Sequence, residues 1–399
     1  MNYQSDYKSV SLLPSDNIKS STVPDVCCRH RRLAHWATII SILSLVHSVY
    51  LRYSYSHHVN HQVEPYTIST VDPTPNQLTT LDNKNDDNEN SLSSFFSWCP
   101  QFSDPWESVT TEFQVPGVTY QALNIEITSR YYIHFETGEA NVLVDESIDE
   151  TIVRFDVSFY NPNDKDLVEF QSEETPDGTL NLSLDAKHPL SRRIFLKLNV
   201  IVTISSPSIL ENLSIQLPNH HITVHGEQTP VFSNLFLATS NGHIETTKGL
   251  ISYSNIILMT SNGSIKTKDL IGNHVQLSSA NGHIYIGIDT LNGDLEGVSA
   301  NGGVTLNAVS ISGEGNMVEL SSSNGHVIAN LPDTFKSLFD VSTTLGKATV
   351  QSDIHPEKIH YDSRRTDRHI KGYYGDIEKK TNNFVKVSSS SGHSTLVFV

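Results

Sequence analysis

The stretch Thr239-Ser-Asn-Gly-His-Ile244 decides the fold of this chain, because the same pattern returns four times after it. The later copies begin at Thr260, Ser279, Ser299 and Ser322, and each has two small residues, Asn-Gly, one variable residue, and then Ile or Val. Successive asparagines of the pattern are 21, 19, 20 and 23 residues apart. A period near twenty residues is typical of stacked repeat arrays.

Aligning the five copies shows three apolar columns. One column stands three positions after each asparagine: Ile244, Ile265, Ile284, Val304 and Val327. Two columns stand four and six positions before it: Leu237, Leu258, Leu277, Gly297 and Leu320, and then Leu235, Ile256, Val275, Leu295 and Val318. The last two columns differ by two residues, so they share one face of a strand. The first column then lies on the next strand, beyond the Asn-Gly pair.

The Asn-Gly pairs are expected to form the corners between these strands. Glycine adopts φ > 0 without a steric clash, and asparagine tolerates the left-handed region better than most residues. If coils stack at about 4.8 Å, equivalent asparagines can hydrogen-bond in a ladder. A run of hairpins with Asn-Gly turns is the competing interpretation. We favour coils, because hairpins do not explain apolar columns that keep register over twenty residues.

The sequence before the repeats also predicts strands. Residues 123–127, 151–157 and 180–184 alternate apolar and polar side chains, and 194–204 is a longer strand-like run. No capped helical pattern occurs in this region, so the fold class is all-β.

Fainter copies of the corner follow the repeats. Leu345-Gly346, Tyr374-Gly375 and Ser391-Gly392 indicate that the stack continues to the C-terminus. Residues 354–371 interrupt the pattern and are expected to form a loop inserted between coils.

The repeated motif, Ser/Thr-Ser/Ala-Asn-Gly-x-Ile/Val, resembles that of the putative-adhesin β-strand repeat family of unknown function, a bacterial and fungal adhesin-like domain. Residues 201–215 are similar to the strand, Pro-containing turn and strand that precede the repeats of that family. The resemblance covers residues 105–399 and implies a β-solenoid-like stack. The family has no established activity, so the resemblance implies an adhesin-like role and no catalytic residues.

One window, residues 33–51, is strongly apolar, with thirteen apolar residues in nineteen and no charge. As a helix it would be about 28 Å long, enough to cross a bilayer core. Arg29, Arg31 and Arg32 precede it directly, and only Arg52 follows closely, so the positive-inside rule predicts a cytosolic N-terminus and a lumenal or extracellular C-terminal part. Residues 33–51 are therefore expected to be a single-pass signal-anchor helix.

This topology divides the chain into five parts, with the boundaries 1–32 for a cytosolic tail, 33–51 for the span, 52–104 for a disordered stalk, 105–234 for the first β-strand part and 235–399 for the repeats. The stalk is rich in Pro, Thr, Ser, Asn and Asp and has no periodicity. Cys27 and Cys28 lie just before the span and are candidates for palmitoylation, with unmodified thiols as the alternative.

Composition excludes several partners and classes. The chain has 399 residues and a formal net charge of −17, and nucleic-acid binding needs a basic footprint, so no nucleic acid is expected. Three cysteines in 399 residues exclude a disulfide scaffold. No cofactor motif occurs, and the histidines after Asn-Gly (His243, His283 and His326) would be two coils apart, too far to share a metal.

Three features remain as candidate chemistry. Asp269 and Asp289 lie one period apart and would be the carboxylate pair of a parallel β-helix enzyme acting on polysaccharides, with solvated turn residues as the alternative. The basic segment 364–371 could hold an anionic glycan or acidic partner, or be a solvated loop. Asn181, Asn212 and Asn262 each begin an N-glycosylation sequon on the expected outer side.

These observations favour a non-enzymatic, membrane-anchored, adhesin-like protein of the surface or the secretory pathway. Its β-solenoid-like ectodomain would bind a glycan or protein on another surface, or serve a structural role. The alternative is a carbohydrate-active enzyme, a polysaccharide hydrolase or lyase, on the same scaffold.

Overall fold

The computed structural model describes residues 107–115, 120–127, 133–187, 193–205, 210–226, 230–362, 364–376 and 381–399. All of them belong to one compact unit, Trp98–Val399. None of the helices in these ranges is long and apolar enough to cross a membrane. The expected span, stalk and palmitoylation candidates, Cys27 and Cys28, lie outside the described residues.

The unit is all-β, as predicted, and its strands are hydrogen-bonded into one large open sheet. The strands before the repeats are β1 (Glu107–Val115), β2 (Ala122–Glu126), β3 (Ile133–Phe135), β4 (Gly138–Val144), β5 (Thr151–Phe159), β6 (Val168–Glu174), β7 (Thr179–Ala186) and β8 (Ile194–Ile204). The 3-10 helix η1 (Pro162–Leu167) begins after Asn161, whose side chain accepts a hydrogen bond from the backbone N–H of Asn163.

The repeat region continues directly from these strands. Its strands are β9 (Asn212–Leu217), β10 (His220–Gly226), β11 (Val231–Thr239), β12 (Ile244–Thr246), β13 (Leu250–Thr260), β14 (Ile265–Lys266), β15 (Leu270–Ser279), β16 (Ile284–Ser299), β17 (Val304–Ile311), β18 (Met317–Ser322) and β19 (Val327–Leu331). The C-terminal elements are β20 (Ser337–Thr343), β21 (Ala348–Ser352), η2 (Pro356–Lys358), β22 (Ile359–Tyr361), β23 (His369–Tyr374), β24 (Phe384–Ser389) and β25 (Ser394–Phe398).

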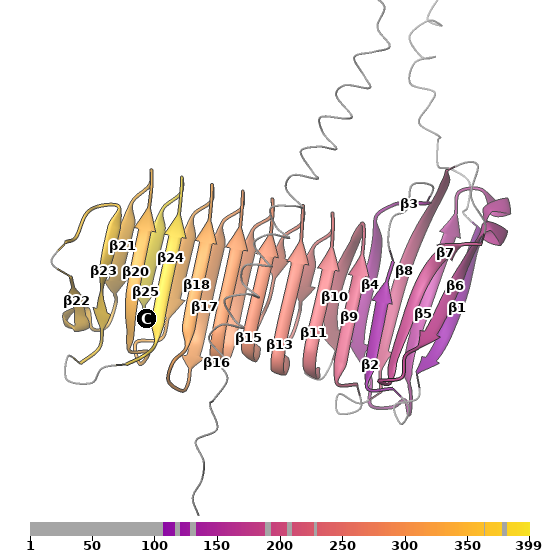
Figure 1. Ribbon diagram of the computed structural model, residues 1–399, viewed down its shortest axis with the longest axis horizontal. Helices are drawn as coiled ribbons and strands as arrows, with labels where there is room; N and C mark the ends of the chain where they lie inside the picture. The colour runs from indigo at the N-terminus through magenta and orange to yellow at the C-terminus, as the bar shows by residue number, and fades with distance from the viewer. Residues whose placement is uncertain are drawn as a thin grey trace, which may run out of the picture. The chain divides into compact units, whose positions relative to one another are not determined.

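Equivalent strands of successive repeats pair in parallel and form two rows (Figure 1). The front row contains β9, β11, β13, β15, the second half of β16, and β18, while the back row contains β10, β12, β14, the first half of β16, β17 and β19. Each Asn-Gly pair connects a front strand to the back strand of the same repeat, and we call one such pair of strands a rung. Parallel pairing excludes the hairpin interpretation, because hairpin strands are antiparallel.

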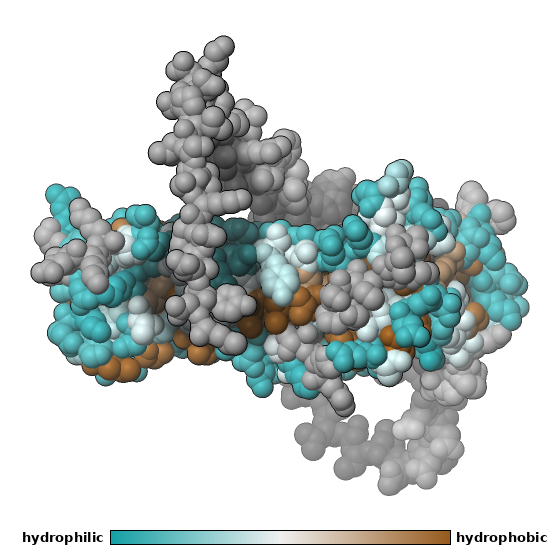
Figure 2. Space-filling model, turned by 90° about the horizontal axis from the view of Figure 1, so that it is seen from below, coloured by the Kyte–Doolittle hydropathy of each residue, from teal (hydrophilic) through white to brown (hydrophobic). Residues whose placement is uncertain are grey.

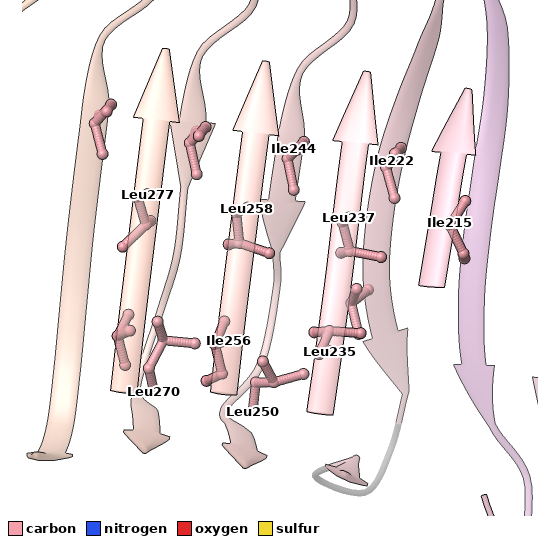
Figure 3. Close-up of a cluster of buried hydrophobic side chains, with 14 of the residues drawn as sticks. Ile215, Ile222, Leu235, Leu237, Ile244, Leu250, Ile256, Leu258, Leu270 and Leu277 are labelled. Atoms are coloured by element: carbon pink, nitrogen blue, oxygen red, sulfur yellow. The ribbon is translucent and has the colours of Figure 1, made fainter. Parts of the chain in front are cut away.

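The predicted columns form the core between the two rows. Figure 3 shows side chains of these columns pointing into it: Leu235, Leu237, Ile244, Ile256, Leu258 and Leu277. Leu237, Leu258 and Leu277 are Cα partners on neighbouring strands and are fully buried. The gap in that column has a simple cause. A Cβ on Gly297 would lie 2.9 Å from Leu320 Cδ2 and 3.0 Å from Ile286 Cδ1, so its neighbours already fill the space.

The last coil is not where the sequence order puts it. β24 pairs in parallel with both β18 and β20, and β25 pairs with both β19 and β21, so the coil 384–398 lies between the coils 317–331 and 337–352 (Figure 1). Stacking order and sequence order therefore differ for the last two pairs of strands. Tyr374-Gly375 is not a corner either, since it ends β23, and Gly375 has a φ of 130°.

The segment expected to be an inserted loop forms a cap on the last rung. It contains η2 and β22, and β23 pairs antiparallel with both β20 and β22. Tyr374 of β23 is fully buried and stacks on Phe398, with ring centroids 3.7 Å apart. The cap thus closes the C-terminal end of the core.

Candidate functional site

The Asn-Gly corners carry a continuous ladder of side-chain amides, as predicted. Each asparagine donates from Nδ2 to Oδ1 of the equivalent residue on the preceding rung, at 2.5–2.6 Å, through Asn324, Asn301, Asn281, Asn262, Asn241 and Asn219. Asn219 in turn donates to the backbone carbonyl of Phe135. The amide ladder is therefore exposed at the corner but saturated along its length, which holds adjacent rungs in register.

A second ladder, buried under the first, was not predicted. The residue two positions before each corner asparagine has a hydroxyl that makes two hydrogen bonds. It accepts the backbone N–H of its own corner glycine and donates to the backbone carbonyl of the glycine at the preceding corner. Both bonds measure 2.8–3.1 Å for Thr260, Ser279, Ser299 and Ser322. The sequence did contain a signal for this ladder, because all five copies of the repeat have Ser or Thr at this position. Only a residue that both donates and accepts, on a short side chain, can serve this buried position.

The corner glycines are required for a different reason from the one expected. No corner glycine is among the described residues with positive φ. Instead, a Cβ on Gly282 would lie 1.8 Å from the carbonyl oxygen of Gly263, and one on Gly263 would lie 1.7 Å from that of Gly242. The prediction of a left-handed corner is therefore wrong, and the need for glycine comes from the close approach of one corner to the next.

The histidines that follow the corner glycines form a third ladder. Nδ1 of each of these rings accepts the backbone N–H of the equivalent residue on the next rung, at 2.8–3.1 Å, in His221, His243, His283, His326 and His393. Two pairs of rings also stack at 5.0 Å, His221 on His243 and His326 on His393. An Nδ1 that accepts an N–H carries no proton, so these rings are in the Nε2–H form and serve the backbone.

One buried histidine was missed in the sequence. His220 takes the glycine position of the first corner, where it is fully buried, and its Nε2 lies 3.0 Å from the carbonyl oxygen of Leu198. Gly138 leaves room for the ring, since a Cβ there would lie 2.8 Å from it. Burial, with a smaller contribution from His221, lowers the pKa of His220 to about 4, although the bond to Leu198 opposes the shift.

The outer surface of the front row has a charged half. Along one column, Gln276 Nε2 donates to Glu296 Oε2 at 3.2 Å, and Lys386 Nζ lies 2.5 Å from Glu319 Oε1. Glu296 and Glu319 are Cα partners on neighbouring strands. Desolvation between the rungs, and then the Glu319 carboxylate, raise the pKa of Glu296, while Gln276 and Lys386 act in the opposite direction.

The other half of this surface is apolar and hollowed. Phe236 and Ile257 are the Cα-paired members of the same column on β11 and β13, and both side chains are half-buried. They line a shallow hollow of about 210 Å³ together with the asparagines of a fourth ladder, in which Asn255 donates to Asn234 and Asn234 to Asn212, each at 2.6 Å. Seen from below, apolar residues are visible near the middle of the molecule and along parts of its edges, among hydrophilic ones (Figure 2).

Asn124 also lines this hollow, and its buried Oδ1 has no hydrogen-bond partner among the described residues. A buried acceptor of this kind is satisfied at low cost by a hydroxyl or a water molecule. The accessible floor of the hollow is apolar, because the amides of Asn212, Asn234 and Asn255 bond to one another, and such a floor suits the apolar face of a ligand.

The two carboxylates proposed for an enzyme are not aligned. The strand register pairs Leu270 with Ile288 and Ile271 with Thr290, so Asp289 falls in an irregularity, and Asp269 precedes the paired segment. Asp269 is exposed with a φ of 52°, and its nearest cation is Lys268 at 4.0 Å. Asp289 is exposed and accepts a hydrogen bond from the hydroxyl of Thr290.

The basic segment 364–371 lies on the cap. Arg365 stacks over the Tyr361 ring at 4.5 Å, and Lys371 and His369 both contact Asp340 at 2.9 Å. Within the described ranges, no three residues of the types His, Cys, Asp and Glu are placed to hold a metal ion.

The three sequons occupy different places. Asn181 on β7 and Asn212 on β9 are half-buried, and their Oδ1 atoms accept hydrogen bonds from Asn124 and Asn234. Asn262 is exposed in the amide ladder and donates from Nδ2, the atom that would carry a glycan. Modification would therefore disturb the ladder at Asn262 more directly than at the other two.

No protein-family model matches the chain, and no curated protein matches it. Several solved structures are similar to it. They include a putative adhesin from Bacteroides fragilis, 14% identical with a TM-score of 0.35, over 73% of this chain and 97% of that one. A putative lipid binding protein from Parabacteroides distasonis is 12% identical with a TM-score of 0.40, over 73% and 97%. A putative cell adhesion protein from Clostridium sporogenes is 11% identical with a TM-score of 0.21, over 73% and 100%. At these identities and scores the similarities do not assign the chain to a family.

Proposed function

We propose that this chain is a non-enzymatic, adhesin-like protein whose β part is a β-solenoid-like stack that contacts another surface. The parallel register supports the solenoid, because equivalent residues of successive repeats are Cα partners from β9 to β18. The ladders of hydrogen bonds at the corners also support the solenoid, because they require each rung to lie directly on the one before it.

The observation that carries the proposal is the outer surface of the front row. It places the apolar pair Phe236 and Ile257, the amides of Asn212, Asn234 and Asn255, and a row of charges on one regular face. Its hollow is shallow, and its polar groups repeat from rung to rung. Such a face can bind an extended ligand through many weak contacts that add up.

We further propose that residues 33–51 anchor the chain in a membrane, with the N-terminus in the cytosol and the β unit outside or in the lumen. The uncharged apolar window and the arginines before it support this topology. The residues of the stalk, 52–104, would reach about 40 Å as a flexible chain, enough to hold the β unit away from the bilayer. Glycans at the sequons and palmitoylation at Cys27 or Cys28 would follow from the same topology.

Catalysis on a glycan needs an acid–base pair held at a fixed separation. The register gives no support to Asp269 and Asp289 as that pair, since Asp289 has no Cα partner on β15. We therefore propose no enzymatic activity.

The test is a binding screen of the unit Trp98–Val399 against cell-surface and cell-wall glycans, with turnover measured in the same samples. Binding that is lost in Phe236→Ser and Ile257→Ser would support the proposal. Tyr253→Ser is the matched control, because Tyr253 is 67% exposed and does not line the hollow. Turnover abolished by Asp269→Asn or Asp289→Asn would overturn the proposal and favour the enzyme.

A further inference from the structure

We propose that the two ends of the row bind each other between copies of this chain, with the C-terminal cap of one copy seated on the N-terminal strands of the next. The proposal concerns the two ends of the row (Figure 1), and at the N-terminal end it uses the continuation of the same outer face onto β2, β7 and β6. It goes beyond the contact function and does not depend on the membrane anchor.

The N-terminal end is strongly acidic. Residues 107–187 contain seventeen acidic and four basic residues. β6 is an edge strand on this side of the sheet, as β1 is, because among the described strands β6 pairs only with β7 and β1 only with β5. The outward side chains of β6 include Glu169 and Glu173, both exposed, so a row of charge borders an open strand edge.

This end also has a hollow that fits a basic side chain. The hollow has a volume of about 310 Å³, and the described residues that line it include Glu126 and Glu173 and no basic residue. Neither Glu126 nor Glu173 forms an ion pair with any residue in the described ranges. An arginine guanidinium binds such carboxylates through two parallel hydrogen bonds.

The C-terminal end carries a local basic segment, within residues 333–376 that hold seven acidic and seven basic residues in all. Arg364, Arg365 and Arg368 are exposed on the cap, and they form no ion pair within the described part of the chain. Their backbone is fixed to the last rung, since the carbonyl of Arg368 accepts the N–H of Thr343 and that of Asp367 accepts the N–H of Ala348, each at 2.8 Å. The three arginines are thus presented from an anchored segment.

A second copy is the partner that satisfies both ends. An anionic glycan would use only the arginines, and a basic peptide would use only the acidic hollow. Because the two surfaces differ, the contact is heterologous, and it leaves one free acidic end and one free basic end on every pair. Such contacts propagate into chains or close into rings.

The experiment measures self-association of the full chain in detergent by sedimentation velocity, at about 20 mM and about 500 mM salt, since ions screen exposed charges. One variant carries Arg364→Glu, Arg365→Glu and Arg368→Glu, and the other carries Glu126→Lys, Glu169→Lys and Glu173→Lys. The matched control reverses three charges in the middle of the row, Lys248→Glu, Lys266→Glu and Lys268→Glu.

We expect the wild type and the control to form dimers and larger species at low salt and to dissociate at high salt. Each end variant alone should associate at least tenfold more weakly. An equimolar mixture of the two should associate again, because each reversed end now meets an opposite charge.

A wild type that stays monomeric at low salt would overturn the proposal, as would an arginine variant that associates like the wild type. Failure of the mixture to associate would also overturn it. If circular dichroism shows that a triple variant is unfolded, the single changes Arg364→Glu and Glu173→Lys, alone and mixed, decide in its place.

Discussion

Replacing Gly282 with alanine tests why the corners contain glycine. A Cβ at this position would lie 1.8 Å from the carbonyl oxygen of Gly263, so the two corners must separate by more than an ångström. That movement breaks the bond from Ser279 Oγ to the Gly263 carbonyl, at 3.0 Å, and strains the bond from the Gly282 N–H to Ser279 Oγ, at 2.8 Å. Two buried hydrogen bonds contribute about 1 kcal/mol each, and overpacking costs about 1–3 kcal/mol. We expect Gly282→Ala to destabilise the unit by about 3–5 kcal/mol.

The assay is urea unfolding of the unit Trp98–Val399, followed by the far-ultraviolet circular dichroism of the β structure. Gly315 is the matched control, because it has a φ of +83° and no atom lies within 4 Å of the place that its Cβ would take. Gly315→Asn should cost under about 1 kcal/mol, since asparagine tolerates the left-handed region. The same substitution at the corner, Gly282→Asn, allows a direct comparison. If it lowers the free energy of unfolding as little as Gly315→Asn does, the corner glycines are explained by their conformational freedom and not by the close approach of neighbouring corners, and the reasoning fails.

Three further predictions concern the core, acid stability and topology. Leu277→Asp buries an unpaired charge in the core between the two rows and should cost several kcal/mol in urea unfolding. Gln276→Ala, on the outer side of the same strand, should cost under about 0.5 kcal/mol, and equal costs would mean that the register is wrong. Because the pKa of His220 is about 4 in the folded state and about 6.5 when free, the unfolded chain binds more protons between these values. The contribution of neutral His220 to the free energy of unfolding is therefore complete above about pH 6.5, and about 3 kcal/mol of it is lost as the pH falls to about 4. In a pH series of urea unfolding, the free energy of unfolding of His220→Gln should therefore fall less steeply over this range than that of the wild type. Finally, glycosidase treatment of the chain from a secretory host should increase its gel mobility, and an unchanged mobility with all three sequons unmodified would remove the main support for the lumenal topology.

The sequence predicted the core of the repeat region, because its signal is local and repeated. The three columns read from the alignment of the Asn-Gly pairs are buried in the structure, and the side chains of one column are Cα partners on neighbouring strands. The same alignment also predicted the amide ladder, because equivalent asparagines on stacked rungs lie next to each other. The hydroxyl ladder was present in the same signal, in the Ser or Thr two positions before each asparagine.

The order of the last coils could not be predicted in the same way. Ser391-Gly392 matches the corner pattern as well as Leu345-Gly346 does, and nothing local to either pair determines which one lies on the corner of Gly325. The structure places Gly392 there, where a Cβ would lie 2.1 Å from the Gly325 carbonyl oxygen. The intervening cap allows this order, because it carries the chain around the outside of the last rung before β24 begins.

The candidate site was predicted only in part. The outer surface of the front row joins residues from distant segments, such as Asn124 with Phe236 and Glu319 with Lys386. Their spacing in the sequence has no period, because β2 and β24 both join the row out of sequence order. Likewise, the role of His220 depends on Gly138, more than eighty residues earlier, which leaves the space for its ring.

The most direct test of the stacked, parallel rungs is disulfide formation between cysteines placed on one outward column of the front row. Ser321, Ser388 and Ser342 are successive Cα partners on β18, β24 and β20. Neighbouring rungs lie about 4.8 Å apart, within the range of a disulfide, and rungs two apart lie near 10 Å, beyond it. In a chain with its native cysteines replaced by serine, Ser321→Cys with Ser388→Cys and Ser388→Cys with Ser342→Cys should each oxidise to a disulfide, and Ser321→Cys with Ser342→Cys should not. A disulfide between positions 321 and 342, with none to position 388, would contradict the stack and the place of its last coil.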